Sequence, residues 1–156
     1  MIVVTGGAGF IGTNLVRSLL ESDKKVLVVE ELDKYTKKFE NIKDLDIEDC
    51  VDNNLFLKDL KNGKYKNKIE YIFHLGACSK TTEQDRDYVM FTNLDYSKDL
   101  LEYSANNNIN MVYASSASVY GSGNVFKEDP ENESSLNHYS ESVSYTHLTL
   151  PTIRLV

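Results

Sequence analysis

Short apolar runs alternate with longer amphipathic stretches over most of this chain. Four of the runs are nearly continuous in apolar residues, which is typical of parallel strands buried on both faces. They predict strands at Ile2–Val4, Lys25–Glu30, Tyr71–Ala77 and Asn110–Ser116. A further short strand is expected within Ile42–Ile47.

The stretches between these runs have helical spacing. A helix is expected from Phe10 with Ile11, Leu15, Leu19 and Leu20 inward, another over Leu55–Leu60, and a long one over Tyr88–Asn106 with Leu94, Leu100 and Leu101 inward. Lys34–Glu40 fits a short helix or a loop, and the polar Glu128–Asn137 a loop. Strands joined by helices through right-handed connections predict an α/β fold, a doubly wound parallel sheet of the Rossmann type.

Composition narrows the function classes. The chain has 156 residues, 41% of them hydrophobic, and a net charge of −7, which suits one globular domain and argues against nucleic-acid or anionic-membrane partners. The two cysteines, Cys50 and Cys78, form neither a metal-ligand spacing nor a disulfide framework. With neither a signal peptide nor a membrane-spanning run apparent, a cytoplasmic location is expected.

The first strand leads into a glycine-rich turn, Thr5–Gly12, with the sequence TGGAGFIG. Gly6 permits the tight turn, Gly9 lets a pyrophosphate approach the backbone, and Gly12 allows close packing of helix on strand. The first helical residues, Phe10 and Ile11, carry N–H groups at the positive end of the helix dipole. This context predicts a dinucleotide site, against the alternative of a glycine turn without a ligand.

The end of the second strand bears on which dinucleotide binds. Glu30 can accept hydrogen bonds from ribose hydroxyls, which favours NAD, or it is simply a solvated acid beside Glu31. Lys34, Lys37 and Lys38 follow, and Lys38 is our candidate for a 2′-phosphate contact, which favours NADP. For any one of these lysines, a charged surface loop is the simpler explanation. The cofactor is therefore expected to be NADP or NAD.

Several motifs together resemble the extended short-chain dehydrogenase/reductases of the NAD-dependent epimerase/dehydratase family. The resemblance rests on the G-x-x-G-x-x-G spacing, Asp46-Ile47, His74–Ala77, Asn93 and Ser115–Gly121. It implies that Asp46 and Ile47 contact adenine. It also implies a cofactor-binding segment made of Leu75, Gly76, Ala77, Cys78 and Ser79, with Asn93 beside it. Leu75 stands where many members carry an acid, and Glu30 where Asp is more usual.

Within that superfamily the chain is most similar to the ADP-L-glycero-D-manno-heptose 6-epimerases. The specific residues are Gly76–Ser79 with Thr81–Glu83, Tyr96–Lys98 with Leu100-Leu101, Tyr113–Ser116, and Leu136-Asn137 before Tyr139. The resemblance implies inversion of C6 in an ADP-heptose substrate for lipopolysaccharide core assembly, by transient oxidation and re-reduction, in a homo-oligomeric enzyme. Another sugar-nucleotide epimerase or dehydratase is the alternative.

The resemblance also implies two catalytic residues. Tyr139 matches the tyrosine of the family's Y-x-x-x-K motif and is the expected acid/base group, and Ser116 is expected to hydrogen-bond the reacting oxygen. Taken alone, Tyr139 is one of ten tyrosines and Ser116 a residue that ends a strand. The lysine of the motif, which would lower the tyrosine pKa, is replaced by Val143.

The resemblance to the family stops at this point of the chain. The segment 143–156, VSYTHLTLPTIRLV, is similar to a translated sequencing adapter, so we expect an incomplete dinucleotide-binding domain at 1–142 and a non-native tail. The C-terminal substrate-binding part of such enzymes would then be absent and the literal chain inactive. A non-catalytic dinucleotide-binding fragment is the hypothesis from a different functional class.

Overall fold

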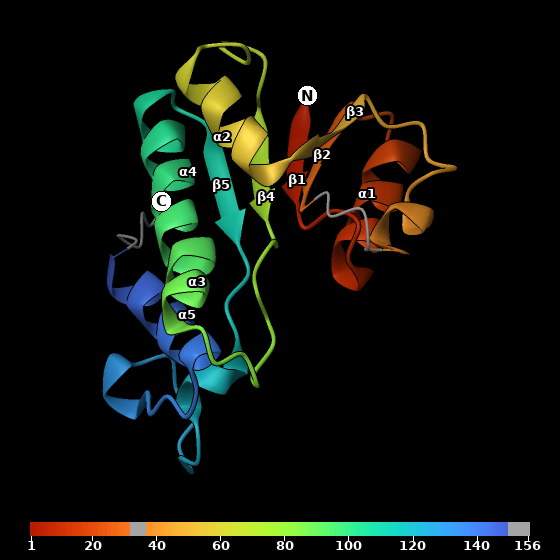
Figure 1. The fold of residues 1–156 in the computed structure, drawn as a ribbon. Coiled ribbons are helices and arrows are strands. Elements are labelled where there is room, and N and C mark those ends of the chain that lie inside the picture. The colour runs from red at the N-terminus through yellow and green to blue at the C-terminus, as the bar shows by residue number, and fades with distance from the viewer. Residues whose placement is uncertain (32–36, 150–156) are drawn as a thin grey trace. The chain divides into compact units, whose positions relative to one another are not determined.

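The computed structural model describes residues 1–31 and 37–149, and the chain forms two compact units (Figure 1). The first unit comprises Met1–Gly76 and Glu102–Ala114, and the second comprises Ala77–Leu101 and Ser115–Val156. Two parts of the sequence predictions lie outside the described residues. They are Lys34, one of the three lysines after the second strand, and the last seven positions of the expected tail.

The first unit is built on a five-stranded, wholly parallel sheet in the order β3-β2-β1-β4-β5. The strands are β1 (Ile2–Thr5), β2 (Val26–Glu30), β3 (Asp49–Asp52), β4 (Tyr71–His74) and β5 (Asn110–Tyr113). The predicted α/β fold is confirmed. The direction of travel reverses between β1 and β4, and the crevice outside the carboxyl ends of strands at such a switch point is where open α/β sheets bind ligands.

Two complete helices cover this sheet. Helix α1 (Phe10–Glu21) joins β1 to β2, and α2 (Asn53–Lys61) joins β3 to β4. Because the two connections run in opposite directions across the sheet, right-handed crossovers place these helices on opposite faces. The short 3₁₀ helix η1 (Lys37–Asn41) lies between β2 and β3, and the unit also includes the end of α4 (Tyr96–Asn106).

The core follows from strand alternation. Ile2, Val4, Val26 and Val28 form one buried cluster with Val16 of α1, while Val3 is buried between them along the strand. Every residue of β1 and β2 is buried, which explains why these strands read as continuous apolar runs. Burial decreases at the end of the sheet, where Val112 of β5 is 52% exposed.

The second unit is mainly helical. It contains α3 (Arg86–Met90), a π-helical turn η2 (Phe91–Asp95), the beginning of α4, the 3₁₀ turns η3 (Ala117–Tyr120) and η4 (Pro130–Asn132), and α5 (His138–Thr149). The expected long helix over Tyr88–Asn106 is present, with Leu94 and Leu100 buried, but a π turn interrupts it. None of the helices in the described part of the chain is long and apolar enough to cross a membrane.

Two predictions about local structure were wrong. The third strand lies at Asp49–Asp52 rather than within Ile42–Ile47, because Ile42, Leu45 and Ile47 pack against the cluster under α1 instead of entering the sheet. Ile11 is 68% exposed, since the buried stripe of α1 runs through Gly12 and Val16 and Ile11 lies to one side of it.

Candidate functional site: a dinucleotide cradle and a serine–tyrosine region

The glycine turn packs backbone against backbone. A Cβ added to Gly12 would lie 2.1 Å from the Gly6 carbonyl oxygen and 2.7 Å from Gly7 Cα, so no side chain fits there. Gly6 has a left-handed φ of 67°, and a Cβ on it would lie 2.7 Å from the Gly76 nitrogen. These two glycines are therefore required by the fold of the turn itself.

The N-terminus of α1 carries no side-chain cap in the part of the chain that the structure describes. Gly9 is its N-cap and has no side chain to accept from the first-turn N–H groups. Among the described residues, a Cβ on Gly9 would meet one atom within 4 Å, the Gly6 carbonyl oxygen at 3.2 Å. Phe10 and Ile11 expose their side chains at the same end. This arrangement fits an anionic group such as a pyrophosphate.

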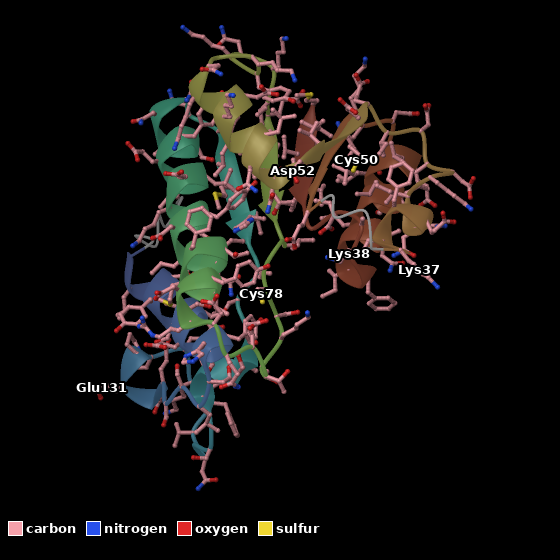
Figure 2. All side chains as sticks on the ribbon, viewed as in Figure 1. Lys37, Lys38, Cys50, Asp52, Cys78 and Glu131 are labelled. Atoms are coloured by element: carbon pink, nitrogen blue, oxygen red, sulfur yellow. The ribbon has the colours of Figure 1, made fainter. Side chains whose placement is uncertain are left out.

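Glu30 lies beside this turn and is 6% exposed. Its Oε2 accepts a hydrogen bond from the Ala8 N–H at 3.3 Å, and its Oε1 accepts from Lys38 Nζ at 2.9 Å and from the Glu31 N–H at 3.2 Å. The carboxylate therefore ties the end of β2 to the glycine turn and carries one ion pair with a half-exposed lysine. Lys38 and the exposed Lys37 both project from η1, as Figure 2 shows.

The edge strand β3 carries a half-buried thiol, Cys50, near these acids. Burial raises the pKa of Cys50 to about 11, with smaller contributions from the carboxylates of Glu30 and Asp49. A protonated thiol is a poor nucleophile, which leaves Cys50 a packing residue.

The end of β4 completes the cradle in the first unit. The Gly76 N–H donates to Thr5 Oγ1 at 3.1 Å, and the Leu75 N–H donates to the Thr5 carbonyl at 3.1 Å. Both predicted residues thus lie at the β1/β4 switch point, next to the glycine turn. Burial lowers the pKa of His74, the last residue of β4, to about 4, so its imidazole is neutral at neutral pH.

The structure separates Asp46 and Ile47 from the cradle. They precede β3, and the next residue, Glu48, donates its N–H to Val26 at the beginning of β2, so the pair lies at the amino end of the sheet. Asp52, which sequence reasoning missed, is the residue at the carboxyl end of β3 and the register partner of Glu30. Its side chain caps α2 by accepting from the Asn54 and Leu55 N–H groups. An N-cap acid before an amphipathic stretch was the available signal.

In the second unit, Asn93 holds the Cys78 loop. Its side-chain oxygen accepts from the Cys78 N–H at 2.7 Å, and its amide nitrogen donates to the Cys78 carbonyl at 3.2 Å and to Ser142 Oγ at 2.8 Å. Asn93 is 5% exposed and lies in the π turn, a helix irregularity often found at functional sites. Ala77 and Ser79, on either side of Cys78, are exposed.

Ser116 and Tyr139 lie on elements of the second unit that pack together, η3 and α5. Ser116 caps η3, and its Oγ accepts from the Ser118 N–H at 3.2 Å and from Ser118 Oγ at 2.9 Å. Among the residues that the structure describes, no hydrogen bond joins Ser116 to Tyr139. Val143 lies one helical turn after Tyr139 and is 8% exposed, in the place of the motif's lysine.

A histidine bridges the same region. His147 of α5 makes a 2.7 Å hydrogen bond to Ser115 Oγ through Nε2 and a 2.8 Å hydrogen bond to Glu133 Oε1 through Nδ1. This bridge connects α5 to the two segments that precede it in this unit. Among the described residues no cluster of histidine, cysteine or acidic side chains could hold a metal ion.

Comparison with known proteins agrees with this geometry. Residues 2–150 match the NAD dependent epimerase/dehydratase family. The ADP-L-glycero-D-manno-heptose-6-epimerase of Helicobacter pylori superposes with a TM-score of 0.80 at 32% identity, over 93% of this chain and 48% of that one.

Two further structures are similar. The UDP-N-acetylglucosamine 4-epimerase of Methanobrevibacter ruminantium has a TM-score of 0.77 at 30% identity, over 94% of this chain and 48% of its own. MoeE5, in complex with UDP-glucuronic acid and NAD, has a TM-score of 0.70 at 27% identity, over 96% and 47%. The chain thus spans about half the length of these proteins.

Proposed function

Because the chain belongs to the NAD-dependent epimerase/dehydratase family, we propose that it is the dinucleotide-binding part of a nucleotide-sugar epimerase. The observation that carries the proposal is the uncapped N-terminus of α1, with Gly9 open to the surroundings and Glu30 bound to the same turn. The first-turn N–H groups would hold the pyrophosphate, and Glu30 would accept from the adenosine ribose.

The substrate we propose is ADP-D-glycero-D-manno-heptose, inverted at C6. Support comes from the Gly76–Ser79 and Thr81–Glu83 segments and from the likeness to the heptose epimerase. The bound dinucleotide would supply transient oxidation and re-reduction of the sugar. Tyr139 would move the hydroxyl proton, and Ser116, whose Oγ accepts from Ser118, would donate its own hydroxyl hydrogen to the reacting oxygen.

Dinucleotide binding is tested by titrating the purified chain with NADH and with NADPH and following the fluorescence of the reduced nicotinamide. We expect saturable binding of at least one of them. Absence of binding to both would overturn the proposal. The oxidised forms, measured by calorimetry, provide the second reading of the same site.

The preference between NAD and NADP is a separate question, which the Glu30–Lys38 pair decides. A 2′-phosphate beside Glu30 needs a cation, and Lys38 is the cation already there. We expect Lys38→Met to weaken NADP more than NAD. Glu30→Gln is expected to do the opposite, weakening NAD more than NADP. Lys37→Met, an exposed lysine on the same 3₁₀ helix, is the matched control.

A second function, a dinucleotide-binding fragment without catalysis, is favoured by one observation. Val143 places an apolar, buried side chain where the motif's lysine would support the tyrosine. Incubation with ADP-D-glycero-D-manno-heptose, followed by proton NMR of the sugar, separates the two functions. Binding without epimerisation supports the fragment. Sequencing the source DNA across codon 143 tests the proposed tail, because a lysine codon there would identify residues 143–156 as foreign.

A further inference from the structure

Thr5 and His74 form a buried pair at the switch point of the sheet. They are the last residues of β1 and β4 and are register partners. Thr5 Oγ1 and His74 Nδ1 are 2.6 Å apart, and the two residues are 2% and 5% exposed. Thr5 begins the glycine turn and His74 begins the His74–Ala77 motif, but neither is among the predicted catalytic or cofactor-binding residues.

We assign the hydrogens of this pair from its neighbours. Thr5 Oγ1 accepts the Gly76 N–H and keeps its own hydrogen, which we place toward His74 Nδ1. In this assignment Nδ1 is unprotonated, and the ring is the neutral Nε2–H tautomer. This agrees with the low pKa that burial gives His74. The threonine hydroxyl therefore links the imidazole of β4 to the backbone that follows the same strand.

The Thr5–His74 pair lies beside a close contact between the backbones of Gly6 and Gly76. A Cβ on Gly76 would lie 3.0 Å from the Gly6 nitrogen and 3.2 Å from Thr5 Oγ1, so the two backbones touch. On its other side Gly6 is fixed to β2, because its N–H donates to the Val29 carbonyl at 2.8 Å. Gly6 is thus held between β2 and Gly76. We expect the separation of β1 and β4 after Thr5 to affect its position.

The position of Gly6 passes directly to the helix that would bind the phosphates. The Gly6 carbonyl accepts the Gly9 N–H at 3.0 Å and sits against Gly12, and Thr13 Oγ1 donates to the Gly7 carbonyl at 3.2 Å. A shift of the β1/β4 gap thus moves the first turn of α1. The pair can influence a bound pyrophosphate without touching it.

We propose that Thr5 and His74 are positioning residues for dinucleotide binding, acting as a hydroxyl–imidazole clamp that holds Gly6 and Gly76 together and so orients the N-terminus of α1. This inference rests on the proposed function, since it names residues that tune the same site. It predicts that the hydroxyl of Thr5, not its size, determines cofactor affinity.

The test compares three variants of the full chain by titration with NADH and NADPH at a temperature well below their unfolding transitions. Thr5→Val keeps the shape and removes the hydroxyl, and it should raise the Kd about tenfold, the equivalent of one hydrogen bond. Thr5→Ser keeps the hydroxyl and should restore affinity to near that of the unchanged chain. Val51→Ala removes buried volume from β3 and should lower the melting temperature while leaving the Kd unchanged.

The outcomes separate the two proposals. If the unchanged chain binds and Thr5→Val binds equally well, the clamp is wrong and the proposed function stands. If Val51→Ala weakens binding as much as Thr5→Val, the effect is general destabilisation and the clamp is again wrong. If the unchanged chain binds neither dinucleotide, the proposed function is overturned and the clamp with it.

One measurement needs no variant and covers the case in which Thr5→Val does not fold. Nitrogen-15 NMR of the His74 ring at neutral pH distinguishes the two neutral tautomers and the charged form. The Nε2–H tautomer is expected. A protonated Nδ1 would contradict the donation from Thr5 and overturn the clamp as assigned.

Discussion

Each of the two units contains candidate site residues, and the two sets are built differently. In the first, the site consists of strand ends and a glycine turn, where backbone contacts leave no freedom at Gly6 and Gly12. In the second, Ser116 and Tyr139 lie on a 3₁₀ turn and a helix, linked by side-chain hydrogen bonds such as that of His147. The comparison teaches that the proposed phosphate site is built from backbone, whereas the proposed proton-transfer residues depend on individual side-chain contacts.

The strongest test of this contrast is Gly12→Ala. Its Cβ would collide with the Gly6 carbonyl, so we expect the free energy of unfolding to fall by about 3 kcal/mol or more and dinucleotide binding to be lost. Gly9→Ala is the matched control, because among the described residues its Cβ meets only the Gly6 carbonyl oxygen, at 3.2 Å instead of 2.1 Å, and it would meet the ligand as well. Denaturant unfolding and NADH titration of both variants should give one destabilised protein and one stable, weakly binding protein. Equal stability of the two would contradict the backbone argument.

The next largest effect is a pH dependence from His74. Its folded-state pKa of about 4 lies below the ordinary value of 6.5, so the unfolded chain binds this proton more readily. The contribution of His74 to the free energy of unfolding is therefore fully present above pH 6.5. It is lost as the pH falls towards 4, and the total loss is about 3 kcal/mol.

Urea unfolding between pH 7.5 and 4.5 measures this loss. His74→Asn lacks the titrating ring, so the difference between the two proteins should shrink steadily on acidification while carboxylates cancel. A constant difference across this range would show that the pKa of His74 is the same in the folded and unfolded chains, so that burial does not lower it.

In the second unit, Asn93 is the side chain on which most depends. Asn93→Ala removes three hydrogen bonds and leaves the Cys78 N–H without its partner, so we expect a loss of about 2 kcal/mol in unfolding free energy. Asn107→Ala, at the end of the same helical stretch, removes one exposed bond to the Tyr103 carbonyl and should change stability little. Comparable losses of unfolding free energy in the two variants would show that the Asn93 hydrogen bonds stabilise the chain no more than one exposed bond does.

Sequence reasoning located the buried central strands and the glycine turn. It missed the edge strand and the π turn. The continuous apolar runs located β1 and β2, and Gly6, Gly12 and Glu30 lie together at their ends. The strand DCVD escaped notice because an edge strand needs only Val51 well buried. The adenine candidates Asp46 and Ile47 came from the family resemblance, and they lie before this strand, at the amino end of the sheet. The hydrophobic periodicity does not predict the π turn. The turn contains Asn93, a buried polar side chain whose hydrogen bond to Ser142 lies outside its own helix.

The smallest expected effect concerns the ion pair between α3 and α5. Arg86 donates to Glu141 twice, from Nε at 3.0 Å and from Nη2 at 2.7 Å, and these bonds are the first cause of the low pKa of Glu141. Arg86→Met should raise that pKa towards its ordinary value and lower the melting temperature only slightly, because the pair is solvent-exposed.

Carbon-13 NMR titration of the Glu141 carboxyl, with and without 1 M NaCl, measures this effect. Salt at that concentration shortens the screening length to about 3 Å, so it should weaken the effect of Arg86 on the carboxyl in the unchanged chain and leave the variant nearly unaltered. Lys98→Met, which removes a looser 3.8 Å pair with Asp95 in the same unit, is the control and should not move the Glu141 pKa. If Arg86→Met also leaves that pKa where it was, the Arg86–Glu141 pair does not form in solution, and α5 with Tyr139 is held by its other contacts with α3, η2 and η3.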